Sequence, residues 1–214
     1  MRYYSAELQE AGDMTITIKI PDSAIALIKQ QQCQEIQVGI DDGRSISPAQ
    51  RRKAYATLRD IAEHTGYSPE EIKEIMKVEH MLRMKETEVI SLADCSMTEA
   101  REFINTLMEY ALKEGIILTE SGLMRTDDID TYLIQCVRYK RCCICGRPAD
   151  IHHVDAIGMG HDRRRVNDSR KRVAALCRRH HAIAHWKGWE RFAASYHVYG
   201  IERYRCEEAD IVDE

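Results

Sequence analysis

The sequence lacks any apolar run long enough to cross a bilayer, which takes about 18 residues. Its first residues, MRYYSAELQE, lack the basic and apolar stretches of a secretory signal peptide. Internal repeats and low-complexity tracts are also missing, which excludes repeat architectures. From these absences we expect a protein that does not contact a membrane and that works in the cytoplasm.

The composition is that of a globular protein with an uneven charge distribution. With 214 residues, of which 44% are hydrophobic, the chain can form one large domain or two modest ones. The segment from Cys136 to Cys206 carries 16 Lys/Arg against 6 Asp/Glu, and the remainder carries 15 against 29. The basic segment favours a polyanionic partner, because neutralised phosphates release counterions, although a solvated basic face has the same composition.

Local patterns predict a mixture of strands and helices before the basic segment. Residues 15–20 (TITIKI) alternate as a half-buried strand does, a helix follows from Asp22, and residues 35–40 (EIQVGI) form a second candidate strand. A serine followed three residues later by Gln or Glu signals helix starts at Ser47, Ser68 and Ser96. We expect helices over residues 48–65, from residue 69 onward, over 97–114 and over 127–140. The apolar face of the helix from residue 69 consists of Ile72, Ile75, Met76 and Val78. In the helix over 127–140, the expected core residues are Ile129, Tyr132, Leu133 and Cys136.

The change in charge places a domain boundary between residues 119 and 138. We therefore expect an α+β protein with a mixed helix and strand module at residues 1–125. A small zinc-stabilised module should follow at residues 126–206, and an acidic, mobile tail at residues 207–214.

The cysteines of the basic segment have the spacing of metal ligands. Cysteines beside histidines in a chain without an export signal favour metal binding over disulfides. Cys142-x-x-Cys145 and Cys177-x-x-His180 are two knuckles that together complete a Cys3His site for a structural Zn2+. Cys143 is out of register, and either packs against the knuckle or interacts weakly with the metal site.

Further histidines remain beside the two knuckles. His152 and His153 are adjacent on a predicted strand, so their side chains point to opposite faces and should have different roles. His181 and His185 are spaced i, i+4 and share one face of a helix. A hydrophobic core needs no such arrangement. The two tryptophans that follow, at 186 and 189, either pack under this helix or stack on a base.

The motifs ADIHHVD and LCRRHHAIAH resemble those of the HNH, or ββα-metal, endonucleases over residues 136–197. The resemblance implies that a catalytic divalent cation (Mg2+, Mn2+, Ni2+ or Zn2+) binds His152, His181 and His185. It also implies that His153 activates water, because a neutral imidazole can accept a proton near neutral pH. Asp150 could orient a ring or an arginine, or be a solvated turn carboxylate.

One position departs from the HNH pattern. The family's middle Asn would fall at Arg172, while Asn167 lies five residues earlier. The loop between the ligand clusters is rich in arginine, which binds phosphate bidentately. Contacts with the DNA backbone are therefore expected from Arg163, Arg164, Arg165 and Arg172.

The N-terminal half resembles the phage recombination-mediator family typified by the lambda Orf protein (NinB). The resemblance covers residues 14–117 and rests on the helix start RSISPAQRRK and on a late helix that ends at GI. It implies binding to single-stranded DNA or to single-strand-binding protein, and assembly into a homodimer. Arg44, Gln50, Arg51, Arg52 and Lys53 are candidate DNA contacts, or simply a solvated helix start.

The two resemblances together favour a metal-dependent endonuclease that hydrolyses DNA phosphodiester bonds in phage recombination or DNA processing. Its substrate would be single-stranded, branched or duplex DNA in a bacterial host cell, with the protein encoded by a phage or prophage. The alternative is a catalytically inactive, zinc-stabilised DNA-binding or recombination-mediator protein, which Arg172 favours. A zinc-ribbon regulator would not need the tandem histidines.

Overall fold

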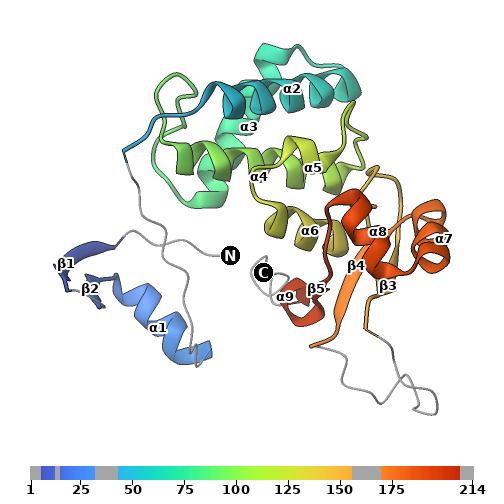
Figure 1. The fold of residues 1–214 in the computed structure, drawn as a ribbon. Helices are drawn as coiled ribbons and strands as arrows, with labels where there is room; N and C mark the ends of the chain where they lie inside the picture. The colour runs from blue at the N-terminus through green and yellow to red at the C-terminus, as the bar shows by residue number, and fades with distance from the viewer. Residues whose placement is uncertain (1–5, 13–14, 32–42, 156–169, 208–214) are drawn as a thin grey trace. The chain divides into compact units, whose positions relative to one another are not determined.

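The computed structural model describes the chain except for residues 1–5, 13–14, 32–42, 156–169 and 208–214 (Figure 1). The chain divides into two compact units, Met1–Asp42 and Gly43–Glu214. The predicted α+β class, with small sheets, is confirmed. The predicted strand at 35–40 and the acidic tail from 208 onward lie outside the described residues. The boundary expected near residue 125 lies within the second unit, and the two-module division stays a prediction.

The first unit contains a hairpin and a helix. Strand β1 (Glu7–Ala11) pairs antiparallel with β2 (Ile16–Lys19), and α1 (Asp22–Gln31) follows. The strand and helix expected at these positions are confirmed, whereas β1 was not predicted. Most described residues of both strands are exposed, so the expectation of a half-buried strand is wrong for this hairpin.

Three capped helices open the second unit: α2 (Pro48–Thr65), α3 (Pro69–Met84) and α4 (Met97–Glu114). Each of the three predicted serines forms a capping box, which satisfies backbone N–H groups at the helix start. Gly115 ends α4 in the left-handed conformation at φ 73°, as expected for a C-terminal glycine. Helix α4 packs against both α2 and α3 and buries Phe103, Ile104 and Leu107 completely.

The predicted apolar face of α3 is partly wrong. Ile72 and Met76 are buried, but Ile75 and Val78 are 46% and 44% exposed. The buried face continues instead to His80, whose Nδ1 lies 2.8 Å from the Thr106 hydroxyl on α4. Residues 72, 76 and 80 follow one helix face at i, i+4 spacing, and apolar composition alone did not identify that face.

Helix α6 (Ile129–Arg138), preceded by the short α5 (Gly122–Arg125), connects the helices to the small sheet. It packs against α4 on one side and β4 on another. Tyr132, Leu133 and Cys136 are buried, as predicted, whereas Ile129 is exposed. Among the described helices, none is both long and apolar enough to cross a membrane.

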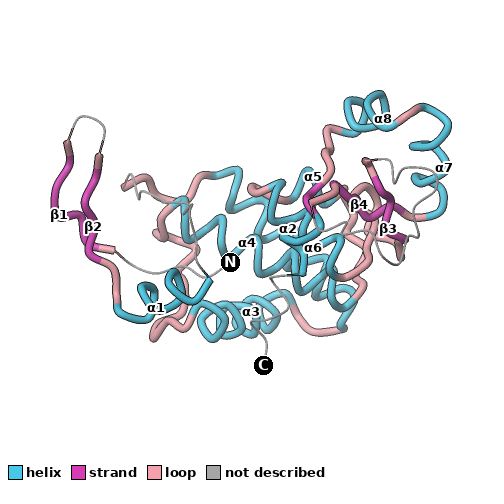
Figure 2. The backbone as a smooth tube through the Cα atoms, turned by 90° about the horizontal axis from the view of Figure 1, so that it is seen from below, coloured by secondary structure: helices cyan, strands magenta, loops and turns pink. Residues whose placement is uncertain are grey.

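The C-terminal part has the predicted ββα order. Strands β3 (Asp150–His153), β4 (Arg172–Leu176) and β5 (Ile201–Glu202) form an antiparallel sheet with β4 in the middle. Helix α7 (Arg178–Lys187) leaves the end of β4 and packs on β3 and β4, as Figure 2 shows. Helix α8 (Trp189–Tyr196) precedes β5 and α9 (Arg203–Glu207) follows it, and α9 packs on α6.

Three polar side chains at the start of α2 bind other parts of the second unit. The buried Gln50 amide donates to the Met97 carbonyl, and the Arg51 guanidinium donates to the carbonyls of Leu92 and Ala93. The Lys53 ammonium pairs with Asp127. These three residues are therefore not a merely solvated helix start, because they bind the segment before α4, the first residue of α4 and the segment after α5.

A buried carboxylate joins three of the helices. Glu109 on α4 pairs with Arg83 of α3 and with Arg138 of α6, and accepts a 2.7 Å hydrogen bond from the Tyr139 hydroxyl. Burial would raise the pKa of Glu109, but Arg83, Tyr139 and Arg138 together hold it below its usual value. The charge of Glu109 therefore compensates two cations at the junction that leads to the knuckle.

We predict that Glu109→Gln lowers the free energy of unfolding by about 3 kcal/mol, because it leaves two arginines without their anion in a largely buried site. The measurement is urea unfolding of the zinc-loaded protein. Glu114→Gln, at an exposed position of the same helix, is the control and should change stability by less than about 0.5 kcal/mol. Equal stabilities for the two variants would contradict the role of Glu109.

Candidate metal centres

The first centre joins the turn after α6 to the start of α7. Cys142 and Cys145 lie in this turn, where the backbone N–H of Gly146 donates to the Cys142 carbonyl and Gly146 has a φ of 68°. Cys177 is the residue that caps α7, and His180 lies in the first turn of that helix. Folding therefore brings together the two knuckles that are far apart in the sequence.

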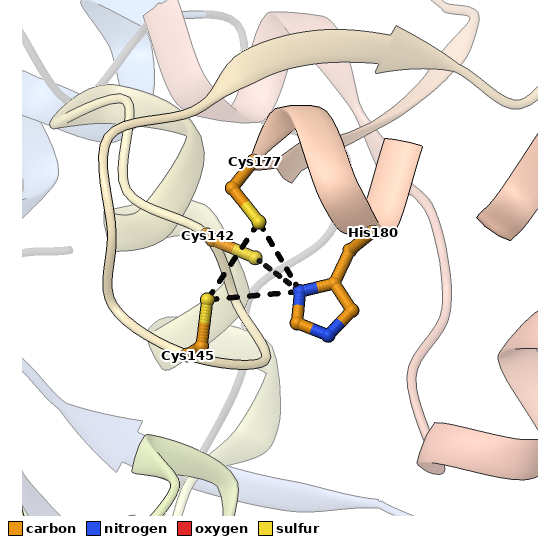
Figure 3. Close-up of side chains that lie close together, drawn as sticks. All are labelled: Cys142, Cys145, Cys177 and His180. Carbon is orange, nitrogen blue, oxygen red and sulfur yellow. Dashed lines mark hydrogen bonds between the residues drawn. The ribbon is translucent and has the colours of Figure 1, made fainter. Parts of the chain in front are cut away.

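The ligand atoms of the four residues converge on one point (Figure 3). The Nδ1 atom of His180 lies 3.3 Å from the sulfurs of Cys142 and Cys177, and 3.6 Å from that of Cys145. The sulfurs of Cys145 and Cys177 are 3.7 Å apart. A tetrahedral zinc has ligand bonds of about 2.3 Å to sulfur and 2.0 Å to nitrogen, which requires edges of about 3.5 to 3.8 Å. The cluster therefore has the size and the donor set of a closed structural zinc site.

Cys143 is not part of this cluster. Its backbone N–H donates to the Ala175 carbonyl of β4, and its carbonyl accepts from the Tyr132 hydroxyl of α6. The side chain is almost completely buried, and burial raises the pKa of its thiol well above the usual value. Of the two alternatives for Cys143, the structure shows the packed neighbour. The isolated Cys95, Cys136 and Cys206 are also buried, while Cys33 lies outside the described residues.

The second centre contains three imidazoles. His152 comes from β3, and His181 and His185 lie one turn apart on α7. Their ring centroids are 4.8 to 5.0 Å apart, and one nitrogen of each ring lies within 4.8 Å of the others. His152 is buried, His181 is half-buried and His185 is exposed, so the centre is open on one side. Closed and open centres of this kind distinguish structural from catalytic metal sites.

The state of the histidines fits a cation at the second centre. The buried Nδ1 atom of His152 has no hydrogen-bond partner, which is costly unless another ligand satisfies it. Burial and, to a smaller extent, the neighbouring His181, His185 and His153 together lower the pKa of His152 to about 4. Burial and His185 also lower the pKa of His181. The lowered pKa values of His152 and His181 favour their neutral form, which is the form of imidazole that binds metal ions.

His153 lies beside this centre but on the other face of the strand. It pairs with Val173 in the β3–β4 ladder, whereas His152 pairs with Ala174. Alternation along β3 therefore separates the two rings, as the sequence predicted. Asp150 shares the face of His152, is exposed, and acts on His181 through its charge. The structure thus places Asp150 on a strand and not in a turn.

Arg172 and Asp155 close the base of the β3–β4 loop. The Asp155 carboxylate accepts from the Arg172 backbone N–H at 2.8 Å and from its guanidinium Nη2 at 2.7 Å. The Val154 N–H donates to the Arg172 carbonyl beside this pair. The guanidinium of Arg172 binds Asp155 in this structure. The predicted contact of Arg172 with a DNA phosphate stays a prediction. The other predicted DNA contacts, Arg163, Arg164 and Arg165, and also Asn167, lie outside the described residues.

Sequence patterns left two contributions to the site unassigned. The sequence predicted no role for Asp155, since its position beside the long loop, opposite Arg172, is the one feature that points to their contact. Trp189 was assigned either to packing or to stacking on a base, and the structure shows packing: its ring stacks on His152 at 5.4 Å and 25°. Trp186 does neither within the protein, because it is exposed.

A Cys3His cluster that could hold zinc, a neighbouring group of three histidines and a ββα frame are the features of the ββα-metal class of modules. The chain matches the model of the family described as "Putative HNHc nuclease" over residues 17–205, and it belongs to this family. Neither a curated protein nor a solved structure matches it. The predicted resemblance to HNH nucleases is thereby confirmed, and a nuclease acts on nucleic acid. The likeness to the phage recombination mediators stays a prediction.

We predict that Cys142→Ser abolishes tight zinc binding and unfolds the C-terminal part of the second unit, because a structural ion and its fold form together. The measurements are zinc content after dialysis and loss of cooperative unfolding. Cys143→Ala is the matched control: it should retain one zinc per chain and lose only packing energy. A Cys142→Ser protein that keeps its zinc and its fold would contradict the closed site.

Proposed function

We propose that the protein is a metal-dependent HNH endonuclease that hydrolyses phosphodiester bonds of DNA. The observation that carries the proposal is the open group of His152, His181 and His185 with His153 next to it. Membership of the HNH nuclease family supports nuclease activity. A purely structural zinc protein would have no use for a second group of three imidazoles, one of which has a buried Nδ1 atom without a hydrogen-bond partner.

The proposal assigns metal binding and proton transfer to different residues. His152, His181 and His185 would hold the divalent cation, and Cys142, Cys145, Cys177 and His180 would hold the structural Zn2+. The catalytic cation, Mg2+, Mn2+, Ni2+ or Zn2+, would supply positive charge that stabilises the scissile phosphate and the leaving oxygen. His153 would take the proton from the attacking water, while the water oxygen bonds to phosphorus and the bond from phosphorus to the leaving oxygen breaks.

The biological setting is part of the proposal. The basic loop with Arg163, Arg164, Arg165 and Arg172 would contact the DNA backbone, and the module at residues 1–125 would bind single-stranded DNA or single-strand-binding protein and form a dimer. The protein would act in the bacterial cytoplasm, in recombination or processing of phage or prophage DNA. An inactive DNA-binding mediator is the alternative, since Arg172 stands where the family has its middle Asn.

We predict that His153→Ala lowers the rate of DNA cleavage by about 10²- to 10⁴-fold, the usual contribution of a general base. The measurement is nicking of plasmid, single-stranded and branched DNA with Mg2+, Mn2+, Ni2+ or Zn2+. His64→Ala, exposed on α2, should cleave like the wild type. Cleavage that persists in His153→Ala would disprove the role of His153. A wild type that cleaves none of these substrates would support the inactive mediator.

We predict two classes of bound metal. The wild type should bind one zinc that dialysis does not remove and a second ion that exchanges, because only the Cys3His cluster is closed. His181→Ala should lose the exchangeable ion and cleavage but keep the tightly bound zinc and the fold. Metal analysis and titration with Mn2+ measure this. Unchanged Mn2+ binding in His181→Ala would contradict the second centre.

A further inference from the structure

Trp186 is an exposed aromatic residue that directly follows His185 of the histidine centre in the chain. It is 82% exposed, the highest value among the exposed large hydrophobic side chains of the described residues. The packing role belongs to Trp189, which stacks on His152 and lies against Phe192. A single exposed apolar side chain needs no explanation by itself. Evidence for a function of Trp186 therefore has to come from the residues around it.

The surroundings of Trp186 are polar and positively charged. The ring lines a shallow hollow of about 520 Å³ together with Lys187, Arg191, Ala194 and Ser195. Glu190 precedes Arg191 in the chain but does not line the hollow. No ion pair of Lys187 or Arg191 occurs in the described part of the chain. The hollow thus combines one flat aromatic face with two cations whose charge is uncompensated there.

A nucleotide of a single strand matches this combination. Its base can stack on an indole ring, and its phosphate attracts lysine and arginine. An acidic peptide or a free phosphate would use the cations but not the ring. A base inside a continuous duplex stacks on its neighbours and cannot reach a protein ring without leaving the helix. The complementary ligand is therefore an unpaired nucleotide.

Trp186 of the hollow and His185 of the histidine centre are neighbours on α7. Trp186 follows His185, so their Cα atoms are about 3.8 Å apart and their side chains diverge by about 100° around the helix. His185 is also the exposed member of the histidine group. A strand whose phosphate lies at the open side of the histidine centre can therefore place an adjacent base at Trp186.

We infer that Trp186, Lys187 and Arg191 form a subsite for an unpaired nucleotide next to the scissile phosphate. The inference rests on the proposed hydrolysis at the histidine centre and makes it more specific. The preferred substrate is then single-stranded or locally unpaired DNA, with the ring as a stacking platform and the two cations as phosphate contacts.

The test compares binding of labelled oligothymidine and of a duplex of equal length, without added divalent cation so that the DNA stays intact. Trp186→Ala should weaken single-strand binding about 10-fold, and Trp186→Phe should restore most of it, because a base also stacks on phenylalanine. Duplex affinity should stay within twofold. Tyr67→Ala, at another exposed aromatic, 56% exposed, is the control and should change neither affinity.

The charges are tested through salt dependence. Lys187→Gln combined with Arg191→Gln should reduce the slope of log affinity against log salt by about 1.4 for the single strand, as expected for two lost phosphate contacts. Single-strand affinity that is unchanged in Trp186→Ala, or that falls equally for single strand and duplex, would overturn the inference. Wild-type protein that shows the Trp186 effect but cleaves no DNA would support the subsite and disprove only the hydrolysis.

Discussion

The main constraint on the C-terminal part is the cross-link that a metal ion bound by Cys142, Cys145, Cys177 and His180 would provide. Helix α7 has only ten residues and no side-chain cap at its start. A helix this short is marginal by itself in water. Two of the four ligands belong to its cap and first turn, so an ion bound there would fix the start of α7 to the knuckle after α6. The orientation of the helix then follows from coordination and not from helix propensity.

This constraint also positions the second centre. His181 directly follows His180 of the Cys3His cluster, and the two side chains diverge around the helix, so one turn of α7 contributes to both centres. His152 approaches from β3, whose register with β4 is fixed by ladder pairs that end at Leu176, one residue before Cys177. The position of the three imidazoles is therefore determined by backbone elements that converge on the closed cluster, with Trp189 stacked behind His152.

Much of this could be predicted from local patterns. Capping boxes at Ser47, Ser68 and Ser96 and the two knuckles depend on short spacings, which a sequence displays directly. The alternation of His152 and His153 likewise follows from strand geometry. Interactions between distant segments were not predictable in this way. The bond of Arg172 to Asp155 and the ion pairs of Glu109 with Arg83 and Arg138 join residues that no local period connects.

The apolar face of α3 also shows that local patterns do not predict contacts between distant segments. Ile72, Ile75, Met76 and Val78 are all apolar, but only Ile72 and Met76 of these four are buried. The polar His80 takes a core position, where its ring lies against the Thr106 hydroxyl of α4. The two tryptophans differ for a similar reason, since Trp189 meets His152 and Trp186 meets solvent. Composition identifies candidate core residues, and tertiary contacts select among them.

The most direct test of the closed cluster is X-ray absorption at the zinc edge, on protein dialysed until one zinc per chain remains. We expect three sulfur ligands at about 2.3 Å and one nitrogen at about 2.0 Å, in tetrahedral geometry. A zinc surrounded only by nitrogen and oxygen would contradict it, because the tightest ion would then lie at the histidine centre and the cysteines could not anchor α7.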